Sequence, residues 1–227
     1  MSVAAKVKKT EGAARPSPRR LATEAKLTKA VGKLIRKHGA EKVGVNAVAA
    51  EAGVDKVLIY RYFGGLDGLL QAYGESADFW PTVDEMLGGP GRPALQLEDP
   101  GDVAAAVFRN LSEGIRRRPV TLELLAWECV ERGPLTAILE ELREKRSDEL
   151  MMTLAQSGLP LQGNASIVLG PLFAAALNYL NLRGRHIVLF GGLDIGPEAD
   201  LEPVYRAIGD AFRALWRVDD DPEPGGR

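Results

Sequence analysis

The chain of 227 residues has very few of the side chains that form disulfides or bind metal ions. Its one cysteine, Cys129, has no partner for an intramolecular disulfide and excludes a cysteine-based zinc site. The two histidines, His38 and His186, lie far apart in the sequence. The sequence has no phosphate-binding glycine loop, dinucleotide fingerprint or nucleophile elbow. We therefore expect no metal ion, no cofactor and no catalytic residues.

Long apolar runs are also missing. Residues 1–20 are basic but contain no apolar core of the kind that a secretory signal needs. The longest apolar stretch, Ile167–Leu180, is interrupted by Gly170 and Pro171 and is shorter than the roughly 20 residues that span a bilayer. A buried helix explains this stretch better than a membrane span. We therefore expect a cytoplasmic protein with no membrane partner.

Charge is unevenly distributed along the chain. Apolar residues make up 45% and charged residues 26% of the sequence, which is typical of an ordinary folded protein. The net charge is only -2, but residues 1–65 hold 14 Lys and Arg against 5 Asp and Glu, a net charge of +9. The remaining residues carry a net charge of -11. One end of the protein is therefore suited to lie near a polyanion.

The first 20 residues are expected to form a disordered basic arm. They combine Lys and Arg with two prolines and contain almost nothing large and apolar. Such an arm could lie along the minor groove of DNA, as basic arms of other DNA-binding domains do, or it could be only a solubilising tail. The sequence leaves both alternatives open.

Three helical patterns follow within residues 21–65. The first has apolar residues at the spacing of an amphipathic helix from Leu27 onward. Two shorter helices, Val45–Ala52 and Asp55–Phe63, are separated by a turn at Gly53. Two short helices joined by a turn that contains glycine are typical of a helix-turn-helix. We therefore predict a DNA-binding domain over residues 21–65.

Two segments separate this domain from the rest of the chain. Residues 66–87 are predicted to form a connecting helix, because apolar residues lie on one stripe from Leu66 to Trp80. Residues 88–101 are half Gly or Pro, cannot continue a helix, and are predicted to be a linker.

The remaining residues, 102–218, are predicted to form a second helical domain. Its helical patterns lie at about 102–117, 120–131, 134–157, 164–190 and 199–217. Only His186–Phe190 is ambiguous between a strand and a helix end. Residues 219–227 are expected to be a disordered acidic tail. The predicted fold is all-α.

The helix at Asp55–Phe63 carries the candidate DNA contacts, because the second helix of a helix-turn-helix enters the major groove. Basic side chains there can donate to guanine, apolar ones can contact thymine methyl groups, and tyrosine hydroxyls can donate to phosphate. The start of the preceding helix can bind phosphate. The candidate residues are Gly44, Val45, Asn46, Lys56, Val57, Leu58, Tyr60, Arg61 and Tyr62. Each of them, taken alone, could be an ordinary surface residue.

The run Val45–Phe63 resembles the DNA-binding signature of the tetracycline-repressor (TetR) family of bacterial regulators. The matching pieces are the Ala-Gly-Val turn at residues 52–54 and the aliphatic-Tyr-x-Tyr-Phe sequence at residues 59–63. With the first helix, the resemblance covers about residues 20–75. It implies a homodimer, a DNA operator with two-fold symmetry, and a C-terminal helical domain that binds a small-molecule effector and releases the DNA, as in a repressor.

Two positions depart from the family pattern. Family members usually have Thr or Ser where Gly44 stands, and a Lys where Leu66 stands. Both residues of the family are expected to contact the DNA backbone. Each charged contact that is missing should lower the salt dependence of DNA binding by about one unit of slope.

The resemblance also implies the roles of residues 102–218. A mostly apolar effector pocket would lie among the central helices, with the candidate residues Phe108, Leu111, Trp127, Glu128, Phe173, Leu177 and Asn178. Plain helix-bundle core is the alternative for each of them. The last two helices would form the dimer interface, with the candidates Ala174, Ala175, Val204, Ile208, Phe212 and Leu215. The apolar stripe on the last helix could also pack only within its own chain.

A second hypothesis comes from a different class of protein. The chain could be a helical enzyme, or a carrier of an apolar small molecule, in which the N-terminal helices are only a scaffold. The uneven charge, the helix-turn-helix and the resemblance together favour the DNA-binding regulator, which is not an enzyme.

Overall fold

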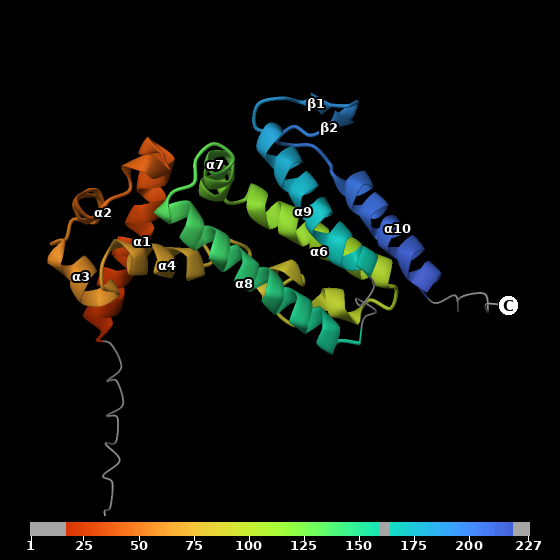
Figure 1. Ribbon diagram of the computed structural model, residues 1–227, viewed down its shortest axis with the longest axis horizontal. Helices are drawn as coiled ribbons and strands as arrows, with labels where there is room; N and C mark the ends of the chain where they lie inside the picture. The colour runs from red at the N-terminus through yellow and green to blue at the C-terminus, as the bar shows by residue number, and fades with distance from the viewer. Residues whose placement is uncertain (1–16, 159–163, 220–227) are drawn as a thin grey trace, which may run out of the picture.

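A computed structural model describes residues 17–158 and 164–219 of the chain (Figure 1). Within these ranges the backbone forms ten α-helices, two short 3-10 helices and a two-stranded hairpin, which confirms the all-α fold. The elements in chain order are α1 (Pro18–His38), η1 (Ala40–Lys42), α2 (Val45–Ala52), α3 (Val57–Phe63), α4 (Leu66–Glu75), α5 (Val83–Met86), η2 (Pro93–Gln96), α6 (Pro100–Arg116), α7 (Pro119–Glu128), α8 (Pro134–Gln156), α9 (Asn164–Arg183), β1 (Leu189–Phe190), β2 (Leu193–Asp194) and α10 (Glu202–Asp219).

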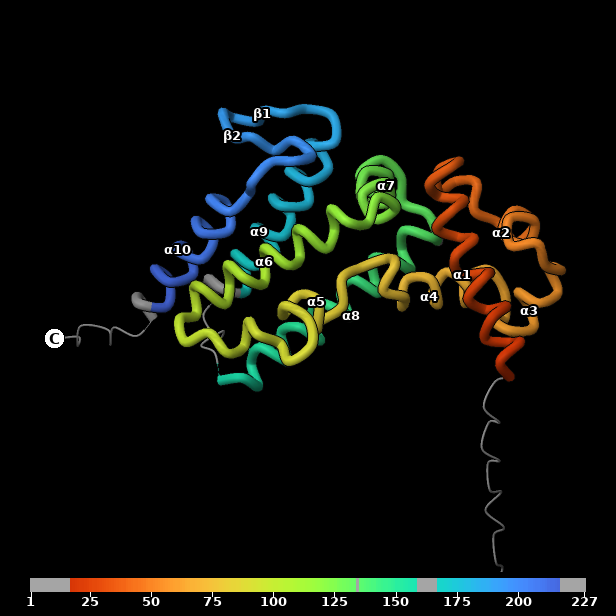
Figure 2. Tube along the Cα trace, turned by 180° about the vertical axis from the view of Figure 1, so that it is seen from behind, coloured from red at the N-terminus to blue at the C-terminus, as the bar shows by residue number. Residues whose placement is uncertain are grey.

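The helices form an elongated molecule (Figures 1 and 2). Helices α1 to α4 lie at one end, and α9, α10 and the hairpin lie at the other end. Helices α6 and α8 run between the two ends, and α7 lies next to α1. In the part of the chain that the structure describes, no helix is both long and apolar enough to cross a membrane.

The apolar stripe of α1 forms the core of the helix-turn-helix. Leu27 and Ile35 are buried, and Val48 of α2 and Ile59 of α3 belong to the same buried cluster. Gly53 ends α2 in the left-handed conformation, with φ 65° and ψ 37°, which glycine adopts without strain. Because Ile59 is fixed in this core, the opposite face of α3 points outward.

Helix α1 begins earlier than predicted. The Ser17 side chain accepts a hydrogen bond of 3.3 Å from the backbone N–H of Arg20, and Pro18 occupies the first helical position, where no N–H is needed. Residues 18–20 therefore belong to the helix, and the prediction that they are part of a disordered arm is wrong. Residues 1–16 lie outside the described residues, so the rest of that prediction is untested.

The single connecting helix predicted for residues 66–87 is wrong. Helix α4 ends before Ser76, whose backbone is extended at φ -72° and ψ 152°. The short helix α5 then starts with a capping box between Thr82 and Glu85. Pro81 stands just before α5 and keeps Trp80 out of a helix, because proline disfavours a helical conformation in the residue before it.

The predicted linker, residues 88–101, is partly folded. Ala94 of η2 is buried in the core, and α6 already begins at Pro100. The Asp99 carboxylate caps α6 by accepting a 3.0 Å hydrogen bond from the backbone N–H of Asp102. The Gly and Pro content correctly excluded a long helix here, but it did not exclude packing.

The predicted helix over residues 164–190 is wrong at its C-terminal end. Helix α9 stops at Arg183, and a β-hairpin follows. The paired residues are Leu189 with Asp194 and Phe190 with Leu193. Gly191 and Gly192, with φ values of 57° and 85°, form the two-residue turn, which favours residues that tolerate positive φ. The ambiguous segment His186–Phe190 therefore ends in a strand.

Helices α6 and α10 cross at two glycines. A Cβ at Gly209 would lie 2.6 Å from the carbonyl oxygen of Gly101, and a Cβ at Gly101 would lie 2.6 Å from the carbonyl oxygen of Gly209. Only hydrogen at both positions lets the two backbones approach this closely. The crossing brings the apolar stripe of α10, including Ile208 and Phe212, into the core.

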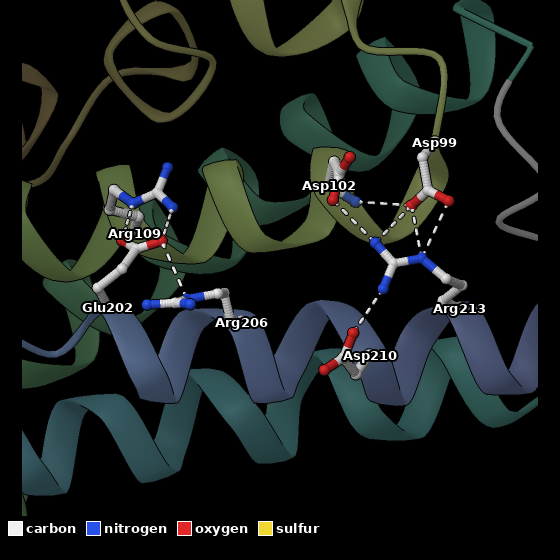
Figure 3. A network of polar contacts seen from close by, with 7 residues as sticks. All are labelled: Asp99, Asp102, Arg109, Glu202, Arg206, Asp210 and Arg213. Atoms are coloured by element: carbon white, nitrogen blue, oxygen red, sulfur yellow. Dashed lines mark hydrogen bonds and ion pairs between the residues drawn. The ribbon is translucent and has the colours of Figure 1, made fainter.

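Ion pairs hold the same two helices together on either side of the crossing (Figure 3). Arg213 of α10 lies 2.8 Å from carboxylate oxygens of both Asp99 and Asp102 at the start of α6. Arg109 of α6 donates hydrogen bonds of 2.6 and 2.8 Å to Glu202 at the start of α10. Such bidentate arginine pairs set geometry as well as adding energy. Helix α10 is therefore a firmly attached part of its own chain.

The substitution Gly209→Ala tests this crossing. An alanine at an unhindered helical position would stabilise the protein by about 0.5–1 kcal/mol. At Gly209 the added methyl group overlaps the α6 backbone, so we expect the free energy of unfolding to fall by about 1–3 kcal/mol in urea denaturation. As a control, Ala207→Ser changes an exposed residue of the same helix, and its free energy of unfolding should stay within about 0.5 kcal/mol of the parent value. A stabilised Gly209→Ala protein would contradict the close crossing.

Candidate nucleic-acid interface

The outward face of α3 combines exposed apolar, aromatic and basic side chains. Val57 is 59% exposed and Tyr60 is 56% exposed, and Lys56 and Arg61 are also exposed. A single exposed apolar residue is common, but here Val57 and Tyr60 are exposed beside two exposed cations on one face of a short helix. These are the side-chain types that read base edges in the major groove. Leu58, also predicted to face outward, is only partly exposed.

The start of α2 lies next to the start of α3. Lys56 donates a 3.4 Å hydrogen bond from its ammonium group to the Asn46 side-chain oxygen. Both residues are exposed, so the pair can separate and contact a ligand. The first backbone N–H groups of α2 have no acceptor within their own helix, and such groups attract phosphate. Lys56, Asn46 and the adjacent backbone of Val45 thus form one continuous surface.

The N-terminal part of α1 reaches the end of α3. The guanidinium group of Arg20 lies 5.0 Å above the ring of Tyr62, a cation–π contact, and its Nε donates a 2.7 Å hydrogen bond to Glu24. Tyr62 is half-buried by this packing. Arg20 therefore adds a positive charge beside α3, which the sequence pattern alone did not associate with that helix.

Other cations of the domain are engaged within the protein. Lys37 donates to Glu51 of α2 at 3.2 Å, and Lys33 lies 3.7 Å from the same carboxylate. The hydrogen bond from Lys37, with the charges of both lysines, keeps the pKa of Glu51 below its ordinary value. The net charge of +9 in residues 1–65 therefore overstates the charge that is free to meet a polyanion.

The two departures from the family pattern have different structural settings. Gly44 precedes α2 with an extended backbone, at φ -153° and ψ 162°, and a Cβ there would have no neighbour within 4 Å. A serine or threonine cap would fit without strain. Leu66, in contrast, is partly buried against the core. Its side chain contributes to packing, which a lysine could not do as well.

Four of the predicted effector-pocket residues come together between α6 and α9. The rings of Phe108 and Phe173 lie 6.1 Å apart between centroids, and Leu111 and Leu177 follow one turn further along their helices. The ring of Phe212 from α10 lies 5.9 Å from Phe108 and completes this aromatic cluster. Phe212 was predicted as a dimer residue, but it is buried within its own chain.

Trp127 and Glu128 lie elsewhere, on α7. The carboxylate of Glu128 accepts hydrogen bonds of 2.5 and 2.8 Å from Arg143 of α8. Burial raises the pKa of Glu128, although the Arg143 charge acts in the opposite direction. Arg143 also lies 5.6 Å from the ring centroid of Trp80. Glu128 thus takes part in a salt bridge between α7 and α8, away from the aromatic cluster.

Sequence reasoning missed a buried polar network beside the aromatic cluster. The hydroxyl group of Tyr205 donates a 3.0 Å hydrogen bond to Ser112, and the Asn181 side chain donates a 3.0 Å hydrogen bond to the same Ser112 oxygen. Two other buried polar atoms, the Asn178 side-chain oxygen and the Trp216 indole nitrogen, have no hydrogen-bond partner among the residues that the structure describes. An interrupted apolar pattern around Asn178 and Asn181 was the available signal.

The predicted dimer residues are distributed differently from expectation. Ile208 is buried against α6, so it offers no surface to a second copy of the chain, and the same holds for Phe212. Val204, Leu215 and Ala174 are partly buried, and Ala175 is exposed. The stripe on α10 packs within its own chain, which was the alternative left open by its sequence.

The exposed apolar surface lies instead on α9 and on the hairpin. The large exposed side chains there are Ile167, Val168, Leu172, Tyr179, Val188, Leu189 and Phe190. Tyr179 and Phe190 pack edge to face with their centroids 5.4 Å apart, so the two parts are continuous. Val168, Leu172, Ala175 and Tyr179 recur at helical spacing and share one face of α9. A helix that is apolar on all sides was the available sequence signal.

Comparisons with known proteins agree with this geometry. Residues 32–73 match the family described as bacterial regulatory proteins, tetR family. No protein of curated function matches the sequence.

Solved structures with a similar fold extend the agreement over most of the chain. The fatty acid degradation regulator FadR from Bacillus halodurans superposes with a TM-score of 0.58 at 15% identity, over 90% of this chain and 99% of that one. A TetR-like transcriptional regulator from Rhodococcus sp. RHA1 superposes with a TM-score of 0.55 at 16% identity, over 86% of this chain and 96% of that one. A TetR family regulator from Marinobacter aquaeolei VT8 gives 0.54 at 17% identity, over 85% and 96%. At these identities the similarity establishes the shared fold.

Proposed function

We propose that this chain, whose residues 32–73 match the tetR family of bacterial regulatory proteins, is a cytoplasmic repressor that binds a two-fold symmetric DNA operator as a homodimer. A small-molecule effector then releases it from the operator. The single observation that carries the proposal is the outward face of α3, where Lys56, Val57, Tyr60 and Arg61 are exposed together.

We propose that α3 enters the major groove and that the start of α2 contacts phosphate. Lys56 and Arg61 are long enough to donate to guanine, while Val57 is placed for a thymine methyl group. Asn46 and the first N–H groups of α2 fit a backbone phosphate. Arg20 lies on the same side through its contact with Tyr62 and fits a second phosphate.

We propose that the homodimer forms through the exposed apolar face of α9 and the neighbouring hairpin. Leu172 is 56% exposed on this face, and the surface is continuous from Val168 to Phe190. Apolar area of this extent on a monomer is costly in water and marks interfaces. A symmetric interface places two α3 helices for two half-sites, as a two-fold operator requires.

We propose that the effector binds at the aromatic cluster of α6, α9 and α10. Phe108 and Phe173 supply apolar walls, and the unpaired oxygen of Asn178 and the unpaired indole N–H of Trp216 can each form one hydrogen bond to a ligand. A buried polar atom without a partner costs about 1–3 kcal/mol, so a matching ligand gains that energy. An apolar molecule with one donor and one acceptor fits best.

The DNA-binding role is tested by selecting sites from a random double-stranded library at near-physiological salt. We expect enrichment of a palindrome with half-sites about one helical turn apart. The double variant Lys56→Ala, Arg61→Ala should lose about 30-fold or more in affinity for the selected site, because each guanine contact contributes about 1–3 kcal/mol.

Two controls accompany that measurement. The double variant Arg132→Ala, Lys145→Ala removes two exposed cations from the regulatory half and should keep its operator affinity. Circular dichroism should show both double variants folded. If the protein binds DNA only weakly and equally well at all sequences, or if it shows a catalytic activity and no preference for any DNA sequence, the carrier or enzyme hypothesis would be favoured.

The dimer proposal is tested by Leu172→Glu. A carboxylate in the centre of the α9 face would lose its water on association, so we expect monomers in sedimentation velocity and weaker operator binding. Val130→Glu changes a side chain that is 84% exposed but lies far from α9 in the chain, between α7 and α8, and should remain dimeric. A Leu172→Glu protein that still dimerises would place the interface elsewhere.

The effector proposal is tested by linkage. A compound found by thermal-shift screening should change operator affinity by some factor, and the operator should change the affinity for the compound by the same factor. Asn178→Leu should lower the affinity of the protein for the compound about tenfold, because it removes one hydrogen-bond partner. Tight binding to the regulatory helices with no change in operator affinity would contradict the proposal.

A further inference from the structure

A cleft of about 500 Å³ lies between the helix-turn-helix domain and the regulatory domain, and we call it the interdomain cleft. One wall is α1, with Lys29, Gly32 and Arg36, and the other wall is the turn from α6 to α7, with Arg117 and Arg118. Both Figures 1 and 2 show α7 next to α1. The cleft is separate from α3 and from the aromatic cluster, so neither DNA reading nor the proposed effector uses it.

Positive charge exceeds negative charge in the interdomain cleft. Arg118 donates hydrogen bonds of 2.7 and 2.8 Å to Glu85, so these two charges compensate each other. Arg117 has only a 3.5 Å contact with the exposed Glu113. Lys29 and Arg36 form no ion pair within the described residues, and Asp78 is the remaining carboxylate of the lining. The unpaired cations thus lie on α1, and the turn from α6 to α7 adds Arg117, whose ion pair with Glu113 is long and exposed.

Tyr73 of α4 adds an unused hydrogen-bond donor. The residue is only 2% exposed, yet it lines the cleft, and its hydroxyl group takes part in no hydrogen bond within the described part of the chain. Burial raises the pKa of Tyr73, and nearby Asp78 adds to the rise while Arg36 opposes it, so the hydroxyl stays protonated. Because the hydroxyl group lines an open cleft, a ligand oxygen would replace water as its hydrogen-bond acceptor.

The local packing presents this hydroxyl group to the cleft. A Cβ at Gly32 would lie 3.3 Å from the Tyr73 ring and 3.4 Å from its oxygen, tighter than ordinary contact. Glycine at this position therefore lets the ring lie against α1. The first turn of α7, at Pro119 and Val120, also lines the cleft and contributes the positive end of a helix dipole.

We propose that the interdomain cleft binds a small multivalent oxyanion, such as a phosphate ester or a polycarboxylate. Arg36 and Lys29 would hold it from α1, Arg117 from the turn, and Tyr73 would donate its hydroxyl hydrogen bond. A guanidinium and an ammonium group on one wall and a guanidinium on the other match an anion with two charged ends. The volume accommodates a small metabolite but not a macromolecule.

A bound anion would link the two domains of the protein. Helix α1 belongs to the DNA-binding domain and α7 to the regulatory domain, and the two helices lie in direct contact. The bound anion would neutralise the cations on both walls, draw the two walls together and so fix the position of α3 relative to α9. This consequence for DNA affinity rests on the proposed function, whereas anion binding itself does not.

The first experiment measures anion binding without DNA. The full chain is titrated with inorganic pyrophosphate and with citrate by isothermal calorimetry at constant ionic strength. We expect one saturable site per chain with a dissociation constant below about 1 mM. Tyr73→Phe keeps the ring and removes the donor, so it should weaken binding about tenfold with no loss of thermal stability. Arg36→Gln should weaken it at least as much.

A matched control keeps the interpretation specific. Lys145→Gln removes one exposed positive charge from α8 and should bind both anions like the parent. Absence of binding by both anions up to about 10 mM would overturn the proposal. Equal binding by the parent, Tyr73→Phe and Arg36→Gln would overturn it as well, because the anions would then bind elsewhere.

The second experiment separates a free anion from a DNA phosphate as the occupant. Operator affinity is measured with and without pyrophosphate for the parent and for Tyr73→Phe. We expect pyrophosphate to shift the affinity of the parent but not of the variant. If Tyr73→Phe instead weakens operator binding in the absence of any added anion, the cleft serves the DNA backbone and the proposal is overturned. Failure of operator binding altogether would leave the calorimetric result intact.

Discussion

One continuous apolar core joins the DNA-binding helices to the regulatory helices, and the position of α3 depends on it. The buried residues from α1 to α10 form a single cluster. The step between the two halves is aromatic, because the ring of Tyr73 lies 6.2 Å from that of Phe79, which lies 6.1 Å from Trp80. Protein interiors are close-packed, so α4 cannot shift without moving these rings. Changes among the regulatory helices therefore have a physical route to the recognition helix.

Polar contacts stabilise the regulatory half and leave two faces free. Arginine–carboxylate pairs hold the crossing of α6 and α10 (Figure 3). Arg143 of α8 pairs with Glu128 of α7, and its guanidinium group also lies over the ring of Trp80. In contrast, Val57 on α3 and Leu172 on α9 remain in contact with water. A rigid body with two uncovered apolar faces at opposite ends suits a protein that pairs with itself and with DNA. The interdomain cleft lies between these ends.

The parts that sequence reasoning predicted well depend on local rules. Periodic apolar residues and glycine stops placed α2, α3 and the end of α1 within a few residues, and proline starts placed α7 and α8. Errors arose where distant contacts decided the outcome. Helix α4 ends at Ser76 because the chain turns to bury Phe79, and α9 ends early because residues 184–194 fold back as a hairpin. Two dimer candidates on α10, Ile208 and Phe212, are buried within their own chain, because an amphipathic stripe does not say which neighbour covers it.

The sequence by itself determined the class of fold, the helix-turn-helix and most of the outward residues of α3, since spacing and turn chemistry are properties of adjacent residues. It also determined that α9 is apolar on several sides. Only the tertiary structure decided that α10 is buried on α6 while α9 is exposed, because two glycines 108 positions apart had to meet at one crossing. It likewise brought Tyr73, Arg36 and Arg117 to one cleft, because two helices and the turn between α6 and α7 contribute them and no local pattern links their positions.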